Sequence, residues 1–301
     1  MQERRNLYDE ISGNKAKSIL LVVFFVLIVI ALGWVFGRLT GYGNGGLALA
    51  AVVSILMSGV SWFYSDKIVL SLSRARPVEK KEFPYLYNTV EGLAIAAGIP
   101  MPKVYVIDDG ALNAFATGRD PSHASIAVTT GLLQKMDRQE LEGVLAHELS
   151  HVKNYDIRYM AMVAVLVGII ALLSDWTIRS FLWGGGRDRD REGGRGGGAL
   201  IVIGLLFAVL APIIAQLVQL SVSRKREFLA DADGALLSRN PQGLASALKK
   251  IAGDGKQLSS ASNATAHLYF SNPFREKNWL SSLFSTHPPI EERIKRLEAA
   301  A

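Results

Sequence analysis

The sequence predicts an α+β protein that is anchored in a membrane by four transmembrane helices. Half of the 301 residues are hydrophobic, and the mean hydropathy of +0.22 is unusual for a soluble protein of this size. Four long stretches contain no charged residue. Between and after them lie two blocks of ordinary soluble composition, in which segments rich in β-branched residues alternate with helical ones.

The four charge-free runs set the membrane topology. A bilayer core needs about 20 apolar residues in a helix, so the first, second and fourth runs are long enough to span and the third is marginal. The first run is no cleaved signal peptide, because no small-residue cleavage site follows it and another apolar run begins at once. The runs are Ser18 to Gly37, Leu39 to Ser65, Tyr159 to Ser174 and Gly196 to Ser223.

These runs divide the chain into four regions. The predicted regions are a tail with the first hairpin (1–65), a first soluble block (66–158), a second hairpin with an Arg/Gly-rich loop (159–223) and a second soluble block (224–301). The net charge of +6 fits Lys and Arg gathered beside membrane spans, so we expect no nucleic acid as a partner. The chain has no cysteine, which leaves only His, Asp and Glu as metal ligands.

The soluble blocks contain recognisable elements. Lys103 to Ile107 and Ala124 to Thr129 are predicted to be short strands. Asp137 followed by Glu140 forms a capping-box pattern, which predicts a helix that runs through His151. The second block carries two segments of helical composition, Glu227 to Ser238 and Pro289 to Ala300. We therefore expect one α+β domain assembled from two separated segments.

The predicted helix contains the pattern His147-Glu148-Leu149-Ser150-His151. A spacing of four places both imidazoles on one face, as two ligands of a single ion require. Glu148 then lies beside the metal, where it can act as general base on a water that the metal activates. Chance alone produces this pattern in roughly one chain in a hundred of this length, so the interpretation depends on finding a third ligand.

Glu227 is the candidate third ligand, because a catalytic zinc takes three protein ligands. Asp231 follows one helical turn later and would accept a hydrogen bond from the far nitrogen of a histidine, His147 by preference. The alternative is a solvated acidic helix face beside Arg224, Lys225 and Arg226. The histidine pair favours the metal site.

Three histidines remain. His287 precedes two prolines and would either donate to an oxyanion during catalysis or serve as a structural turn residue. His123 lies beside a turn and His267 in a polar stretch. We expect both of these to be ordinary surface residues.

Three motifs in this order resemble the M48 family of membrane zinc metallopeptidases, which includes the HtpX-type proteases and the prenyl-protein proteases. They are His147 to His151, Glu227 to Asp231 and Ser285 to Ile294. Two apolar runs on each side of the catalytic helix look like the HtpX-type branch.

The resemblance implies a gluzincin-type catalytic domain, one Zn²⁺ per chain and endopeptidase activity in the bacterial cytoplasmic membrane. It implies unfolded or damaged membrane proteins as substrates and functional overlap with other membrane quality-control proteases. The segment Asn113, Ala114, Phe115, Ala116 is similar to the substrate-binding edge strand of gluzincins, whose backbone pairs with an extended peptide. A plain internal strand is the alternative for this segment.

Other functions remain to be weighed. The prenyl-protein-processing branch has more spans than this chain offers, and a membrane metal-binding or transport protein would place ionisable residues within the spans, where this chain has none. A catalytically dead scaffold would have no need of Glu148. A set of two histidines and one glutamate accepts several divalent ions, and the sequence leaves the oligomeric state open.

Topology follows from the metal site. Positive residues flank the first hairpin on both sides, which predicts that the catalytic domain faces the cytoplasm. His151 and Glu227 must meet on one ion, so the number of crossings between them is even. We favour two crossings, although the loop from Trp183 to Gly198 would then carry its arginines outside.

Overall fold

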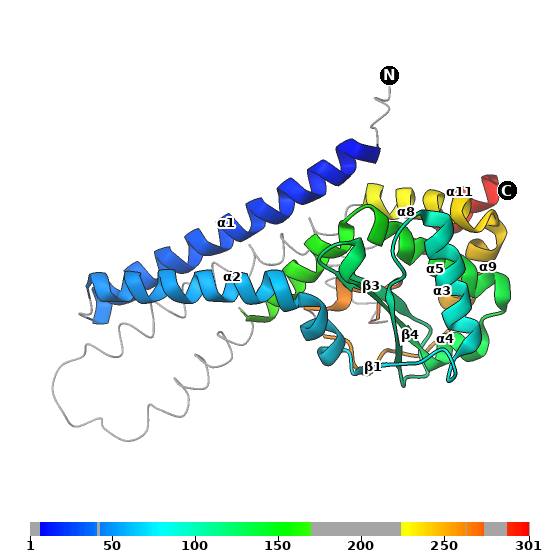
Figure 1. Cartoon of the computed structure of the whole chain (residues 1–301), viewed down its shortest axis with the longest axis horizontal. Helices are drawn as coiled ribbons and strands as arrows, with labels where there is room; N and C mark the ends of the chain where they lie inside the picture. Colours follow the sequence, from blue (N-terminus) through cyan, green and yellow to red (C-terminus); the bar gives the residue numbers. More distant parts are fainter. Residues whose placement is uncertain (1–6, 41–42, 170–223, 263, 274–287, 301) are drawn as a thin grey trace.

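Two long helices form an antiparallel hairpin that extends away from the rest of the molecule (Figure 1). The computed structural model describes residues 7–40, 43–169, 224–262, 264–273 and 288–300. The hairpin consists of α1 (Leu7–Thr40) and α2 (Asn44–Leu72). Both are long and apolar enough to cross a membrane, as expected for the first two runs. The fourth run and the Arg/Gly-rich loop lie outside the described residues.

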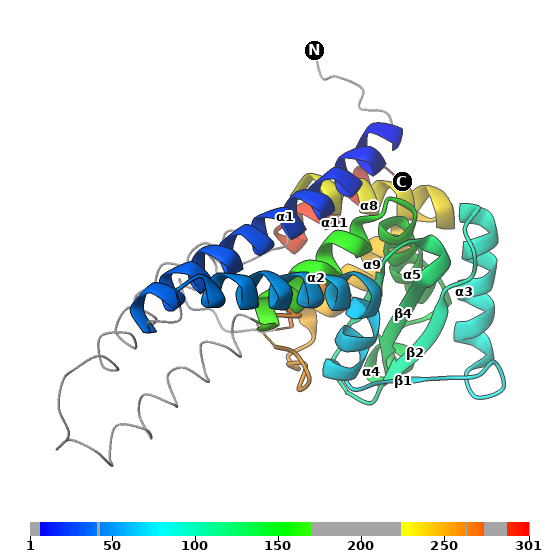
Figure 2. The same cartoon turned by 60° about the vertical axis from the view of Figure 1, so that its left-hand side comes forward.

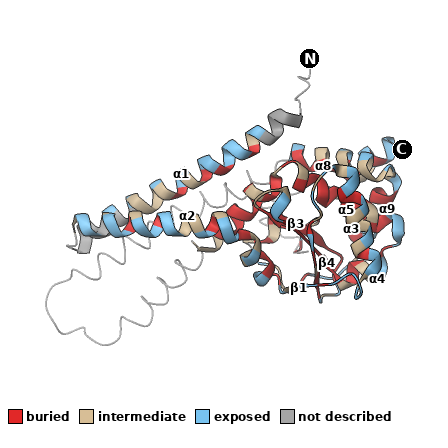
Figure 3. Cartoon of the chain, viewed as in Figure 1, coloured by how far each residue is buried: buried red, intermediate tan, exposed pale blue. Residues whose placement is uncertain are grey.

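Burial in the hairpin is the reverse of burial in a soluble protein. Exposed and intermediate residues run along both helices (Figure 3), and many of the exposed ones are large and apolar. Large exposed side chains include Leu20, Leu27, Leu49, Ile55 and Leu56. An apolar surface of this extent is stable against lipid and unfavourable in water.

A four-stranded mixed sheet lies beside the base of the hairpin. Its strands are β1 (Ala75–Pro77), β2 (Lys103–Ile107), β3 (Ala114–Gly118) and β4 (Ala124–Thr129), in the order β1-β2-β4-β3. The parallel pair is β2 with β4, and the other neighbours are antiparallel. The two strands expected from the sequence are confirmed, and β3 lies at an edge of the sheet.

Helices cover the sheet at the end of the molecule away from the hairpin tip (Figure 2). The capping box at Asp137 and Glu140 is confirmed and begins α5. The predicted helices in the second block are also confirmed, as α8 and α11. The helices are α3 (Pro84–Ala97), α4 (Thr130–Lys135), α5 (Arg138–Lys153), α8 (Arg224–Ser238), α9 (Pro241–Gly253) and α11 (Ile290–Ala299), with short 3₁₀ turns η1 (Pro121–His123) and η2 (Ala266–Leu268).

Helix α5 lies in backbone contact with its neighbours on two sides. A Cβ on Gly234 of α8 would lie 2.9 Å from the backbone nitrogen of His147, and a Cβ on Gly143 would lie 2.8 Å from Cα of Leu244 in α9. Only glycine permits such close approach. The second segment of the chain is thereby held tightly against the helix that carries both histidines.

Residues 156–169 are helical and contain the first part of the third apolar run. Their apolar face, with Met162, Val163 and Leu166, packs against Leu21 and Phe25 of α1. The described part of the third run is therefore covered by α1.

The surface position expected for His267 is wrong. Its exposed fraction is 1%, and Nε2 lies 3.0 Å from the carbonyl oxygen of Met160. The neighbouring Leu268 and Tyr269 belong to a buried apolar cluster. The histidine is buried because it directly precedes them in the chain. His123 is half exposed, as expected, and bonds to Asp120.

Candidate metal centre

Helix α5 brings the two histidines of the His147–His151 motif together, one turn apart on its buried face. Their Nε2 atoms lie 3.2 Å from each other. Glu227 approaches from α8, with its carboxylate oxygens 3.8 Å from Nε2 of His147 and 3.6 Å from Nε2 of His151. The ligand atoms of these three side chains all lie within 4.8 Å of one another.

The tautomers of both histidines are set by carboxylates on their far sides. Nδ1 of His147 lies 2.9 Å from Asp231 Oδ1, and Nδ1 of His151 lies 3.0 Å from Asp156 Oδ2. An ionised carboxylate only accepts hydrogen bonds, so each Nδ1 carries the proton. Once free of its proton, each Nε2 would present a lone pair, so that two lone pairs and a carboxylate would converge on one point.

In their deprotonated forms these three groups repel one another, so they favour a cation between them, either a proton or a metal ion. Tetrahedral zinc with bonds of 2.0 to 2.1 Å would place its ligand atoms about 3.3 Å apart, close to the separations observed here. The donor set therefore fits a metal ion, with both histidines oriented by outer carboxylates in the manner usual for metal sites.

Glu148 lies next to the three candidate ligands and is not one of them. Its Oε2 accepts a hydrogen bond of 2.8 Å from the backbone N–H of Ala116 in β3. Its pKa is raised to about 7, chiefly by burial; the charge of His151 opposes this shift and the nearby carboxylate of Glu227 contributes to it. A carboxylate with a pKa near neutrality is well matched to proton transfer.

The histidines differ in their electrostatic surroundings in the absence of a cation. Burial lowers the pKa of His147 to about 4, aided by the positive charge of Arg293. Burial would also lower the pKa of His151, but the hydrogen bond to Asp156 and the charge of Glu227 raise it to about 9.

Arg293 is a part of the site to which sequence reasoning gave no role. Its guanidinium is buried and donates two hydrogen bonds, of 2.8 and 2.7 Å, to the two oxygens of Asp231. It lies 3.7 Å from Glu227 Oε2 and stacks on the ring of Phe270. Burial would raise the pKa of Asp231, but the charge of Arg293 lowers it to about 2. Asp231 thus remains an anion that orients His147.

Asp156 is the second residue that sequence reasoning missed. It follows a break in the helix at Tyr155, whose φ of 61° is left-handed, and this turn brings the carboxylate back toward His151. A sequence signal exists: an acidic residue just beyond the second histidine can reach its Nδ1.

Ala114 to Ala116 of the predicted substrate segment lie in the edge strand β3, next to the candidate metal ligands, and Asn113 directly precedes that strand. The Asn113 side chain bonds to the backbone of Ser271, and the Ala114 carbonyl accepts from the N–H of Phe270. Ala116 contacts Glu148 as described above, and Phe115 is buried. His287 lies outside the described residues.

Comparison with known proteins gives a consistent result. The family model described as Peptidase family M48 matches residues 80–301. A "Protease HtpX homolog" of Thermoanaerobacter pseudethanolicus is 47% identical over 98% of this chain and 98% of its own length. Proteins of the same description from Tropheryma whipplei and Listeria monocytogenes are 46% and 44% identical over 97% of this chain, and over 98% and 99% of their own lengths.

A solved structure shares the fold. The crystal structure titled S. mikatae Ste24p matches with a TM-score of 0.53 at 22% identity, covering 95% of this chain and 66% of that one. At this identity the likeness concerns the fold alone. From the family model and the near full-length relatives, this chain belongs to the M48 family of peptidases.

Proposed function

We propose that this membrane protease binds one Zn²⁺ through His147, His151 and Glu227 and hydrolyses peptide bonds with Glu148 as general base. The observation that carries the proposal is the convergence of two imidazole lone pairs and a carboxylate, with a fourth ionisable group beside them. Nitrogen and oxygen ligands at this spacing suit zinc. Metal analysis of the purified protein would distinguish zinc from other divalent ions.

The chain's own residues have separate tasks in this mechanism. A bound zinc ion would polarise the attacking water and the scissile carbonyl. Glu148 accepts the proton of that water and then delivers it to the leaving nitrogen. The Ala116 N–H holds the Glu148 carboxylate in place. We assign to His287 a hydrogen bond to the developing oxyanion.

Substrates would bind as an added strand along β3. The backbone groups of Ala116 and Gly118 face the outer edge of the sheet, because the N–H of Ala116 points to Glu148 and alternate residues of a strand share an edge. Strand addition recognises the main chain, so sequence specificity is loose. Such specificity suits an endopeptidase that degrades damaged or misfolded membrane proteins, and other quality-control proteases would share part of that task.

We place this catalytic domain, formed by 66–158 and 224–301, on the cytoplasmic face of the bacterial inner membrane, with four spans in total. Basic residues on both flanks of the first hairpin support that orientation. A single cysteine near Gly193, in a chain that lacks cysteine, would test it. Labelling by an impermeant reagent there, with protection of a cysteine near Lys135, fits four spans; protection at both sites contradicts them.

The decisive test is proteolysis of an unfolded membrane protein by the purified full-length enzyme. We expect cleavage by the wild type, loss of cleavage with a chelator, and recovery when zinc is restored. Glu148→Gln should retain the metal and lose cleavage. Near wild-type turnover by Glu148→Gln would contradict the proposed mechanism.

A further inference from the structure

The edge strand β3 runs from the metal ligands toward the membrane hairpin. Ala116 contacts Glu148 at the metal site, whereas the Arg119 guanidinium just beyond the strand lies 5.5 Å from the ring centre of Phe63 in α2. Val69 and Leu70 of α2 share a buried cluster with Phe115. The strand and the helix thus lie side by side, in contact.

Phe63 marks the level of the membrane surface. From Asn44 to Tyr64, α2 is about 30 Å long, which is the thickness of the hydrocarbon core. Its residues Trp62, Phe63 and Tyr64 form an aromatic group, and Trp and Tyr concentrate at membrane interfaces. Phe63 is 57% exposed. The charge-free run of α1 begins directly after Lys17.

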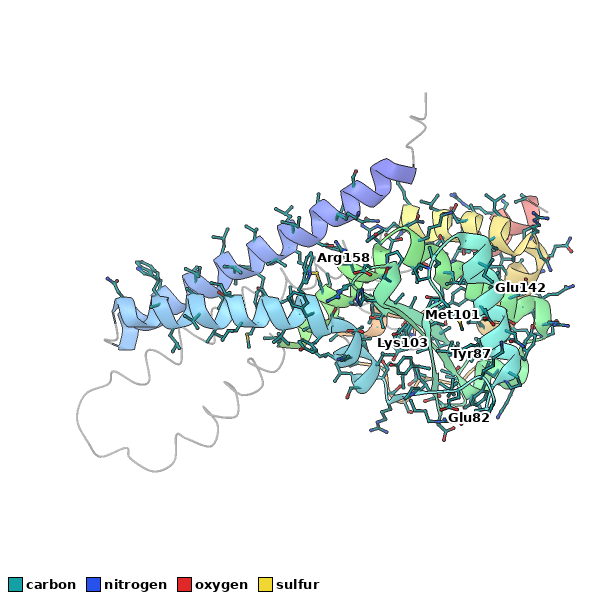
Figure 4. The ribbon with its side chains drawn as sticks, viewed as in Figure 1. Glu82, Tyr87, Met101, Lys103, Glu142 and Arg158 are labelled. Carbon is teal, nitrogen blue, oxygen red and sulfur yellow. The ribbon has the colours of Figure 1, made fainter. Side chains whose placement is uncertain are left out.

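Basic side chains fix this level from the side of the catalytic domain. The Arg158 guanidinium lies 5.0 Å from the ring centre of Trp62 and 5.2 Å from that of Tyr155, over which Lys15 of α1 also lies. Figure 4 shows Arg158 where the hairpin meets the domain. Both membrane helices are therefore tied to the domain at one height.

We infer that the peptide-binding edge of β3 begins at the membrane surface, so that the enzyme cleaves chains close to the point where they leave the bilayer. This inference rests on the proposed function. From Arg119 to Ala116 an extended strand covers about 10 Å, or roughly three residues. The preferred substrate is a membrane protein with an unfolded juxtamembrane segment, cut about three to six residues from the hydrocarbon boundary.

Position-resolved proteolysis tests this inference. The full-length enzyme and a single-span substrate would be reconstituted together in vesicles of phosphatidylethanolamine and phosphatidylglycerol. One cleavable sequence would follow the substrate helix directly or after flexible spacers of roughly 10 and 20 residues. Mass spectrometry of the products would locate the cuts, with Glu148→Gln as the inactive control.

We expect cuts within about six residues of the helix end in every substrate, and at least roughly tenfold slower cleavage of the displaced sequence. Cuts that follow the sequence outward at an unchanged rate would overturn the inference. A soluble peptide with the same sequence separates the two proposals: its hydrolysis by the wild type alone supports the proposed function whatever the vesicles show. If neither substrate is cut, both proposals fail.

A different observation supports a second inference, concerning Asn14 of α1. Its buried side-chain amide donates hydrogen bonds of 2.7 Å to Asp156 Oδ1 and 2.9 Å to the Asn154 carbonyl oxygen. The other oxygen of Asp156 accepts the bond from His151. Arg226 of α8 lies 3.3 Å from Asp156 Oδ1. Asp156 therefore joins the first membrane helix to both helices that carry metal ligands.

We infer that Asn14 is a positioning residue, which orients Asp156 and through it the imidazole of His151. The test is zinc affinity, measured by chelator competition with the purified full-length protein. Asn14→Ala should weaken zinc binding roughly tenfold, the lower end of the range for groups that support metal ligands. Asn14→Asp should weaken it more, because a second carboxylate would face Asp156.

Ser54→Ala is the matched control, because Ser54 is also buried in the hairpin and, among the residues that the structure describes, its hydroxyl bonds to Ala51 of its own helix and to no other residue. It should leave zinc affinity unchanged. In the background Asp156→Ala, adding Asn14→Ala should have no further effect on affinity. An equal loss in both backgrounds, or a lowered stability of the metal-free protein with unchanged affinity, would overturn this assignment.

Discussion

The metal centre and the hairpin break the same rule of soluble proteins in opposite ways. The centre buries charged groups such as Glu227, Asp231 and Arg293, and the hairpin exposes leucines and isoleucines. Inside the domain each charge is stable because a partner of opposite sign or a hydrogen bond compensates it. On the hairpin the apolar surface is stable only if lipid replaces water. One region depends on its internal partners and the other on its solvent.

The largest effect on the buried centre is expected when one of the proposed metal ligands is removed. Glu227→Ala should abolish stoichiometric zinc binding, with a loss of activity beyond the roughly 100-fold that is usual for groups that merely support ligands. Metal content and peptide hydrolysis would be measured together. The exposed Glu298, paired with Lys249, provides the control Glu298→Ala. Tightly held zinc in Glu227→Ala would require a different third ligand.

Removing a buried partner should destabilise the domain strongly. Arg293→Met leaves Asp231 buried without its compensating charge, and we expect a loss of about 3 to 5 kcal/mol in the free energy of unfolding. The double variant Arg293→Met with Asp231→Asn should lose less, because no uncompensated charge remains. Thermal unfolding in detergent would compare the two. Equal losses would mean that the pair contributes little.

Replacement of an exposed leucine by a charged residue should impair membrane insertion only when the leucine lies in the hairpin. Leu56 of α2 is 63% exposed and Leu236 of α8 is 76% exposed. Leu56→Lys should cost about 2.5 to 3.5 kcal/mol of membrane insertion, whereas Leu236→Lys faces water and should cost almost nothing. The fraction of protein that stays in alkaline-washed membranes measures the difference. Identical retention would contradict the lipid-facing assignment of α2.

Removing the negative charge of Asp231, which bonds to Nδ1 of His147, should have a moderate effect on zinc binding. Asp231→Asn keeps the shape of the side chain but removes the charge that fixes the Nδ1 proton, and we expect zinc binding weaker by roughly 10- to 100-fold. Chelator competition measures this affinity. Unchanged affinity would show that Asp231 serves only to hold Arg293.

Among these tests, a change to acidic pH should produce the smallest effect on kcat/KM. Glu148 works as a base only when deprotonated, that is, above its pKa of about 7, so kcat/KM should fall as the pH drops through that value. A bound cation lowers the pKa of a neighbouring carboxyl, so between pH 8 and pH 6 we expect at most about a tenfold loss. A rate that rises toward pH 6 would contradict the role of general base.

The sequence predicted those parts of the structure that depend on near neighbours in the chain. The strands β2 and β4 and the start of α5 follow from local patterns, and the spacing of His147 and His151 fixes their common face. The roles of Asp156 and Arg293 could not be derived in this way. One depends on a left-handed turn at Tyr155, and the other on the packing of α11 against α8.

His267 shows why composition alone misleads. Its neighbours on the N-terminal side are polar, and this predicted exposure. Its actual position is set by Leu268 and Tyr269, which enter an apolar cluster built from α2, β3 and the helix 156–169. Burial here is decided by contacts between segments more than 100 residues apart, such as His267 and Met160.

The centre combines His147 with Arg293, so it can form only after both residues have been synthesised. A ribosome adds about 5 to 20 residues per second, so roughly 7 to 30 s separate the synthesis of the first histidine from that of the arginine. During this interval the residues of α5, and later those of α8, have been synthesised, but α11 has not. A chain that is still being synthesised therefore lacks the arginine that bonds to Asp231, and the centre is complete only after α11 has been made.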